Sequence, residues 1–322
     1  MKKTLIALAA MSAFGLAQAQ SNASISGLVG FAYQSIDVIA APGVLAGANR
    51  GLTQTDVVVS VAASETLADG VKIEAGLTLE AAAGNFASAM TRTDSFLQLG
   101  ASFGTLRFDQ TRTSNLLIKG MVAPSSLAET MYDSSGVIDR LLAEVMSYTS
   151  PEMGGLVGSL ALVEAMNDGA TLPGATAVVL GVNYAKGPLA AGMAYKSYTF
   201  DPVITGIVNP LRKSRLEAFA TYDLGVAQLG VGYDGANVGT MVANAVDDAA
   251  AYALGVAVPM GAFTLGANWA KRNANTVSEF VVKYDLSKRT NLNWSFGKQS
   301  FDATPGTNLN GQQYRFALFH SF

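Results

Sequence analysis

The segment VKIEAGLTLE, residues 71–80, alternates between two kinds of side chain along its whole length. Its odd-numbered positions are apolar, whereas its even-numbered positions carry lysine, glutamate, glycine or threonine. A period of two places successive side chains on opposite faces of a β-strand. The segment is therefore predicted to be a strand with one oily face and one polar face.

The same pattern recurs along the chain in pairs of segments that are joined by short turns. Upstream of residues 71–80 a second alternating segment ends at a four-residue turn, 67–70, which is suited to a hairpin. Another hairpin joins SFLQLGA (95–101) to TLRFDQ (105–110). With the first and last segments, these pairs predict about sixteen strands of the length that a tilted membrane strand needs.

Longer connections alternate with the short turns. They are rich in polar or small residues and lie at residues 38–53, 167–175, 201–214 and 236–248. Short turns on one side and longer loops on the other are typical of outer-membrane barrels. No segment of the sequence has the composition of a linker or of a second domain.

The composition also favours strands over helices as the membrane-crossing elements. The chain is 50% hydrophobic and has a mean hydropathy of +0.29, yet beyond its first residues no apolar run is long enough to span a bilayer as a helix. An open sheet edge in hydrocarbon would leave backbone groups without hydrogen-bond partners. We therefore predict an all-β fold, a closed transmembrane antiparallel β-barrel of about sixteen strands.

The last nine residues, YRFALFHSF, fit this fold. Tyr314, Phe316, Leu318 and Phe322 fall on one face of the final segment. In a barrel that face meets lipid, and aromatic side chains gather near the membrane interfaces. The final strand is predicted to pair with the first.

The first nineteen residues are a predicted secretory signal peptide. Lys2 and Lys3 precede an apolar run, and the small residues Ala17 and Ala19 precede Gln20. This order is typical of a signal peptide that is cleaved after residue 19. The prediction is a signal peptide over 1–19, a barrel domain over 20–322, and export through the periplasm to the outer membrane.

Charge and cysteine content exclude several classes of function. Without Lys2 and Lys3, 19 basic residues face 24 acidic ones, a net charge of −5, and both signs are scattered. This pattern predicts no nucleic-acid partner. The chain has no cysteine, so it has no disulfide, thiol nucleophile or thiolate metal site. We expect no metal and no cofactor.

Three stretches resemble the general porins of the Neisseria, Bordetella and Burkholderia type. SETLADGVKIEAGLTLE (64–80) is similar to that family's second turn and third strand, with Glu65, Leu67, Gly70, Leu79 and Glu80 in the matching places. LQLGASFGTLRF (97–108) resembles the hairpin before the third loop, and YTSPEMGGL (148–156) resembles the strand end and turn after it. The terminal aromatic residue, with His320 two residues before it, also fits.

The sequence departs from the family pattern at three places. Asp109, Gln110 and Thr111 stand where the family usually has Gly-Arg-Gln at the mouth of the third loop. Gly30 replaces a common aspartate, and Met153 replaces a common phenylalanine. An arginine expected at the constriction is therefore absent from its usual position.

The resemblance implies a passive diffusion channel for ions and small hydrophilic solutes. It implies that the connection from Arg112 to Asp139 folds into the lumen and narrows it. Acidic loop residues would then face basic residues of the wall, and opposed charges act strongly in a narrow aqueous pore. The candidate lumen residues are Lys72, Glu74, Glu80, Arg107, Asp109, Arg112, Glu129, Asp133, Asp139 and Arg140.

Simpler roles stay open for these residues. Arg107 and Asp109 share a face and would also form a plain ion pair. Lys72 and Glu74 would also suit a wide part of the channel, and the acidic loop residues would be solvated if the loop did not fold inward.

Ten aromatic residues fit an outward register near strand ends and predict a membrane belt. They are Tyr33, Tyr148, Tyr184, Tyr195, Tyr222, Tyr233, Trp269, Tyr284, Trp294 and Phe316. The resemblance further implies a homotrimer, contact with outer-membrane lipid and lipopolysaccharide, and recognition of Phe322 as a signal by the outer-membrane assembly machinery.

Three rival functions remain: a channel selective for one solute, a plugged structural or adhesin barrel, and an outer-membrane enzyme. The enzyme is disfavoured because His320 is the only histidine and lies in the outward register. The chain also lacks the G-x-S-x-G and H-E-x-x-H motifs.

Overall fold

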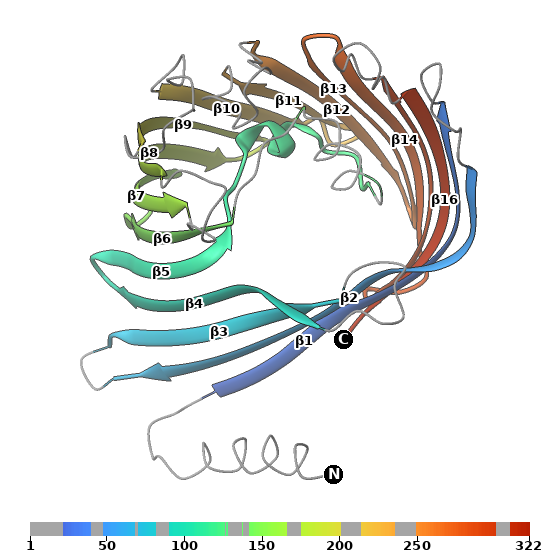
Figure 1. Ribbon diagram of the computed structural model, residues 1–322. Helices are drawn as coiled ribbons and strands as arrows, with labels where there is room; N and C mark the ends of the chain where they lie inside the picture. Colours follow the sequence, from blue (N-terminus) through green and yellow to red (C-terminus); the bar gives the residue numbers. More distant parts are fainter. Residues whose placement is uncertain are drawn as a thin grey trace.

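The computed structural model describes residues 22–39, 48–67, 70–81, 90–125, 127, 137, 142–165, 175–200, 214–235, 249–300 and 310–322. These residues form a closed barrel of sixteen strands with a short 3-10 helix inside it (Figure 1). The first eight strands are β1 (Asn22–Ile39), β2 (Ala48–Thr66), β3 (Lys72–Glu80), β4 (Thr91–Ala101), β5 (Gly104–Arg112), β6 (Leu142–Thr149), β7 (Leu156–Ala165) and β8 (Ala175–Lys186). The others are β9 (Leu189–Phe200), β10 (Ser214–Asp223), β11 (Gln228–Asp234), β12 (Ala251–Met260), β13 (Phe263–Arg272), β14 (Asn275–Asp285), β15 (Thr290–Ser300) and β16 (Asn310–Ser321). The 3-10 helix is η2 (Leu116–Gly120).

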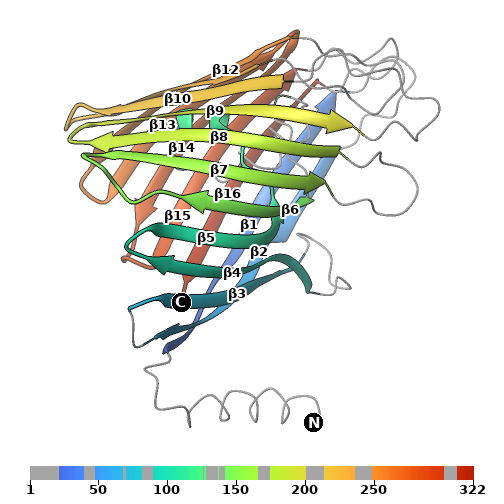
Figure 2. The ribbon, with the colours of Figure 1, turned by 90° about the vertical axis from the view of Figure 1, so that its left-hand side faces the viewer.

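Every strand pairs antiparallel with its neighbours in sequence, and β1 pairs with β16. The closing register runs from Leu28 opposite Ser321 to Ile39 opposite Asn310. Figure 2 shows β3 to β9 lying side by side in this order. The predicted all-β barrel and its closure by the final strand are confirmed.

Short turns join the strands at one end of the hairpins. Gly187 and Pro188 alone connect β8 to β9, and Gly187 has φ 61°, a left-handed conformation that glycine adopts without strain. The predicted connection at residues 38–53 is too long. The β1–β2 ladder continues until Asp37 faces Ala48, and Arg50 forms an ion pair with Asp37 at 3.7 Å.

The two faces of the sheet have opposite character, as the alternating sequence predicts. Large apolar side chains point outward and are exposed on the single chain, for example Tyr33 (59%), Leu254 (53%) and Phe316 (52%). An apolar surface that runs around a whole barrel matches the lipid-facing band of a membrane barrel. All ten aromatic residues of the predicted belt lie in the outward register. No helix of the described residues is long and apolar enough to cross a membrane.

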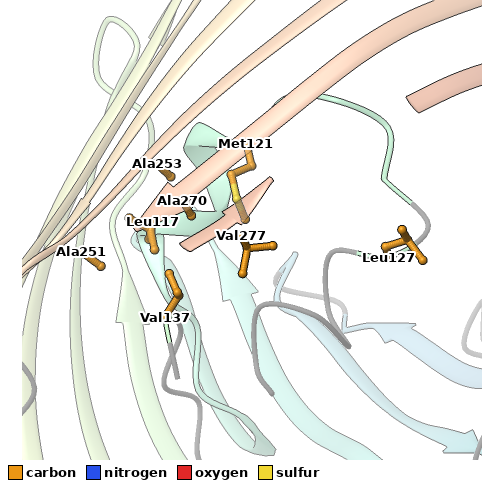
Figure 3. Close-up of a cluster of buried hydrophobic side chains, with 8 residues drawn as sticks. All are labelled: Leu117, Met121, Leu127, Val137, Ala251, Ala253, Ala270 and Val277. Carbon is orange, nitrogen blue, oxygen red and sulfur yellow. The ribbon is translucent and has the colours of Figure 1, made fainter. Parts of the chain in front are cut away.

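The hydrophobic core lies inside the barrel, between the wall and the segment that follows β5. Its members are Leu117, Met121, Leu127, Val137, Ala251, Ala253, Ala270 and Val277. Figure 3 shows Leu117 and Met121 beside Ala253 and Ala270 of the wall. The inner face of β12 to β14 is therefore not uniformly polar, because small apolar residues replace charged ones where the segment packs.

Candidate functional site

A line of polar side chains crosses the inner faces of β3, β4 and β5. Lys72 Nζ lies 2.9 Å from Glu74 Oε2, and Gln98 Nε2 donates to the same oxygen at 3.4 Å. Gln98 Oε1 in turn accepts from Arg107 Nη1 at 2.9 Å, and Arg107 Nε donates to Asp109 Oδ1 at 2.6 Å. These five residues are called the wall cluster below. Period-two alternation places them all on one face, because Glu74 faces Gln98 and Gln98 faces Arg107 across the ladders.

The Arg107 guanidinium is held in place from two sides. Besides its two hydrogen bonds, it lies over the ring of Phe96, 4.0 Å from the ring centre. Phe96 in turn packs on Gly76, where a side chain would collide with the ring. The Arg107 side chain keeps 37% of its surface exposed, so a fixed cation faces the lumen beside the largely covered carboxylate of Asp109.

The structure brings four of the predicted lumen residues together and places Glu80 and Arg112 elsewhere. Glu80 lies at the far end of β3, six residues from Glu74, or roughly 20 Å along the strand. Arg112 ends β5 in the outward register, because Arg107, Asp109 and Thr111 occupy the inward positions. Arg112 is therefore not part of the wall cluster. The remaining candidates, Glu129, Asp133, Asp139 and Arg140, lie outside the described residues.

The segment after β5 enters the lumen and lies against the opposite wall. The helix η2 contacts β9, β10, β11 and β12. Figure 1 shows it inside the barrel, next to β10 and β11. Asn115 caps η2, its Oδ1 accepting from Leu117 N at 2.9 Å. The described part of the predicted 112–139 loop, residues 113–125 with 127 and 137, is called the lumen loop below.

Asp234 on β11 is the centre of a buried ionic network that holds the lumen loop. It is fully buried and forms a bidentate pair with Arg215 of β10. Arg272 of β13 reaches it at 2.5 Å, and Asn115 Nδ2 of the loop donates to it at 2.9 Å. Arg272 Nε also donates to the backbone oxygen of Val137 at 3.1 Å. One carboxylate thus joins three strands, β10, β11 and β13, to the loop.

Glu217 on β10 forms the second junction. Its Oε2 accepts from Leu116 N at 3.1 Å, which satisfies a backbone donor at the start of η2. Its Oε1 lies 2.6 Å from Lys196 Nζ and 3.3 Å from Arg215 Nε. Lys196 also donates to the backbone oxygen of Ser114 at 3.0 Å.

Two asparagines continue the attachment around the wall. Asn268 of β13 accepts from Ala123 N at 3.1 Å, and Asn293 Nδ2 of β15 donates to Pro124 O at 2.9 Å. The lumen loop is therefore bonded to wall strands between β9 and β15. Sequence reasoning missed these residues, although the alternating pattern places each of them on the inner face.

The wall cluster and the lumen loop lie on opposite sides of the ring. In a closed ring of sixteen strands, β4 and β12 are eight strands apart in either direction. β4 carries Phe96 and Gln98, and β12 contacts η2. A closed barrel with an oily exterior, charges on its inner wall and a loop attached across the lumen defines a channel-forming β-barrel of the outer membrane.

Comparison with known proteins identifies the family within this class. The model of a family described as Gram-negative porin matches residues 4–304. The chain belongs to the Gram-negative porin family. A comparison with curated proteins yields no match.

Solved structures share the fold. An anion-selective porin from Comamonas acidovorans superposes with a TM-score of 0.64 at 19% identity, covering 94% of this chain and 100% of that one. A mutant of the Rh. blastica porin superposes with a TM-score of 0.61 at 12% identity and the same coverage. The membership and the barrel make the protein a passive diffusion channel of the outer membrane.

Proposed function

We propose that ions and small hydrophilic solutes cross this barrel between the wall cluster and the lumen loop, which together form its constriction. The observation that supports this is the attachment of residues 115–124 to the inner wall opposite Arg107. Arg107, Asp109, Lys72 and Glu74 act as the fixed charges of the wall. A transverse field orients the water in a narrow pore, and an apolar solute must displace that oriented water. Polar solutes therefore pass more readily than apolar ones.

Further charges from the loop and from β3 belong to the proposed constriction. Glu129, Asp133 and Asp139 supply the acidic side, and Arg140 and Glu80 line the approach to it. Lys119, at the end of η2, is exposed and lies over the ring of Phe219, 5.1 Å from its centre. The sign of the selectivity depends on which of these charges stands nearest to the path.

Single-channel conductance of the mature protein in a planar bilayer tests the function. Stepwise ohmic conductance establishes an open pore, and the reversal potential under a KCl gradient gives its ion preference. Flux that rises linearly with concentration and falls with solute size supports a general channel. Flux that saturates for one solute favours a selective channel, and a folded barrel that never conducts favours a plugged structural barrel.

We also propose that the protein assembles as a homotrimer through the outer faces of β2, β3 and β4. No aromatic side chain points outward from these three neighbouring strands, whereas each strand from β8 to β16 carries one. Many of their outward residues are aliphatic, such as Val61 and Leu77. Aromatic side chains mark the contact with membrane interfaces, so a face without them suits another protein surface.

A bulky substitution distinguishes this face from the lipid-facing one. Val61→Trp on β2 should convert trimers to monomers in detergent, because a well-packed contact does not accept an indole. Leu254→Trp on β12 is the matched control, since lipid accommodates the added ring. Light scattering of the purified barrels measures the state, and a trimer that survives Val61→Trp contradicts the proposed contact.

Two further proposals concern biogenesis. Residues 1–19 are a signal peptide, and the mature barrel domain is 20–322; mass spectrometry of the protein from outer membranes should give an N-terminus at Gln20. Phe322 is the residue that the outer-membrane assembly machinery reads, in a membrane whose outer surface offers lipopolysaccharide as a lipid partner. We propose no cofactor, metal, nucleic-acid partner or enzymatic activity for the chain.

A further inference from the structure

Four glycines on the inner wall lie directly under the lumen loop. Gly230 and Gly232 of β11, Gly255 of β12 and Gly266 of β13 all occupy inward positions, and Gly230 faces Gly255 across the ladder. All four are buried. They are called the glycine floor below.

A side chain at any of these positions would collide with the loop. A Cβ at Gly232 would meet the backbone oxygen of Leu117 at well under 3.0 Å, a distance that real Cβ atoms essentially never show. At Gly230 the colliding atom is the backbone oxygen of Gly120, and at Gly255 it is the backbone nitrogen of Val122. The obstacles are mostly backbone atoms, which cannot turn aside as a flexible side chain can.

The loop contributes a matching glycine of its own. A Cβ at Gly120 would meet the backbone of Val231 and Gly232 at well under 3.0 Å. Here the backbone of the loop rests on the backbone of the wall, with no side chain between them. Such close approach requires glycine on both surfaces.

The glycine floor explains how far the loop stands from the wall, which the ionic network does not determine. The bonds to Asp234, Glu217 and Asn268 determine where along the wall the loop is attached. A hydrogen bond between two side chains, such as that from Asn115 to Asp234, tolerates some displacement of the loop, because both side chains can rotate. Backbone contact at the glycines determines how far the loop protrudes.

We propose that the glycine floor sets the width of the channel, by letting the lumen loop lie flush with β11 to β13. Each glycine removes the side-chain layer that would otherwise hold the loop away from the wall. The floor is thus a determinant of size selectivity that carries no charge. This inference rests on the proposed constriction and adds a residue class to it.

Alanine and valine at the floor test the proposal. Gly232→Ala and Gly255→Ala should lower the single-channel conductance and the largest sugar that passes in vesicle-swelling assays. Gly232→Val should lower both further, because the added volume lifts the loop more. The reversal potential should stay near that of the wild type, since no charge changes.

Gly100→Ala is the matched control. Gly100 also faces inward, on β4, but a Cβ there would meet only Thr105 Oγ1 at 3.7 Å, an ordinary contact. This variant should conduct like the wild type. Gly120→Ala approaches the same contact from the loop and leaves every wall strand intact, so it keeps the test decisive if wall variants fail to fold.

The outcomes separate this inference from the function on which it rests. A wild-type barrel that does not conduct refutes the constriction itself. A conducting wild type with unchanged or larger conductance in Gly232→Ala, Gly255→Ala and Gly120→Ala overturns the glycine floor alone. Reduced conductance in these variants, with Gly100→Ala unchanged, supports it.

Discussion

Phe322 and Gly27 join the two ends of the barrel through a reciprocal pair of backbone hydrogen bonds. Gly27 N donates to Phe322 O at 3.0 Å, and Phe322 N donates to Gly27 O at 3.1 Å. The Phe322 ring covers Gly27 so closely that a Cβ on the glycine would collide with it. The last residue of the chain therefore completes the closing ladder and shields it from the outside.

Deleting Phe322 should reduce the yield of folded barrel both in cells and on refolding into detergent. The deletion removes two backbone hydrogen bonds from the β1–β16 ladder that closes the barrel. Heat-modifiable electrophoretic mobility measures the folded fraction. A deletion that refolds normally in detergent but fails in cells would assign Phe322 to recognition alone, and normal levels in both would contradict both roles.

Gly27→Val separates the packing from the terminal signal, because it leaves Phe322 in the chain. The new side chain collides with the Phe322 ring and with the backbone oxygen of Val58, so refolding in detergent should become less efficient than in the wild type. Phe322→Tyr serves as the control, since a ring of similar shape is retained and should fold normally.

Asp234→Asn should destabilise the barrel and loosen the lumen loop. The change leaves the buried guanidinium groups of Arg215 and Arg272 with Glu217 as the remaining carboxylate of the network. Removing one partner of a buried ion pair costs about 3–5 kcal/mol. We expect a lower thermal midpoint by circular dichroism and added noise in the open-channel current.

The control for this change is Asp285→Asn. Asp285 forms a partly exposed ion pair with Lys283 at 2.8 Å, and such pairs contribute little. An Asp234→Asn barrel as stable as Asp285→Asn, with a quiet current, would show that the network does not hold the loop.

The alternation of apolar and polar residues with a period of two explains how much of the fold could be predicted from the sequence. Alternation along residues 71–80 and 105–110 determined which side chains face inward, so Arg107 and Asp109 were correctly expected to share a face, and the ion pair that was left open between them is present. The strand count and the closure also follow, because the membrane forbids an open edge. The end of the β1–β2 ladder did not, since residues 48–53, most of which are polar or small, pair with β1, while Val38 and Ile39 pair with β16.

The attachment of the lumen loop could not be predicted from the sequence. Asn115 and Asp234 are 119 residues apart, and alternation says only that Asp234 faces the lumen. Which loop meets it depends on how the chain crosses the barrel. The glycine floor is hidden for a similar reason, because glycine in a strand also marks bends and bulges.

Asp109→Asn should shift the channel toward anions, and Arg107→Gln should shift it toward cations. Asp109 neutralises Arg107 at 2.6 Å, so removing the carboxylate leaves a fixed cation on the wall. A unit charge about 5 Å from a passing ion in water changes its energy by about 0.8 kcal/mol, or roughly fourfold in permeability. Reversal potentials under a KCl gradient measure the shift.

The double variant of these residues tests the simpler reading. If Arg107 and Asp109 only neutralise each other, the double change restores the wild-type reversal potential. Single variants that leave the reversal potential unchanged would instead place the wall cluster away from the narrowest part of the path.

Glu144 and Glu164 are two like charges that lie side by side on the outer face. They are directly opposed across the β6–β7 ladder, and both are exposed in the outward register. Like charges that face each other on neighbouring strands are destabilising. Either Glu144→Gln or Glu164→Gln should therefore stabilise the detergent-solubilised barrel by about 0.5 kcal/mol.

The salt dependence of this gain in stability shows whether repulsion between the two carboxylates causes it. At 1 M salt the screening length is about 3 Å, so the gain from either substitution should fall. The second substitution should add little to the first, because one change already removes the repulsion. Additive gains that do not depend on salt would mean that each glutamate is unfavourable in the apolar face by itself, and that the two carboxylates do not act on each other.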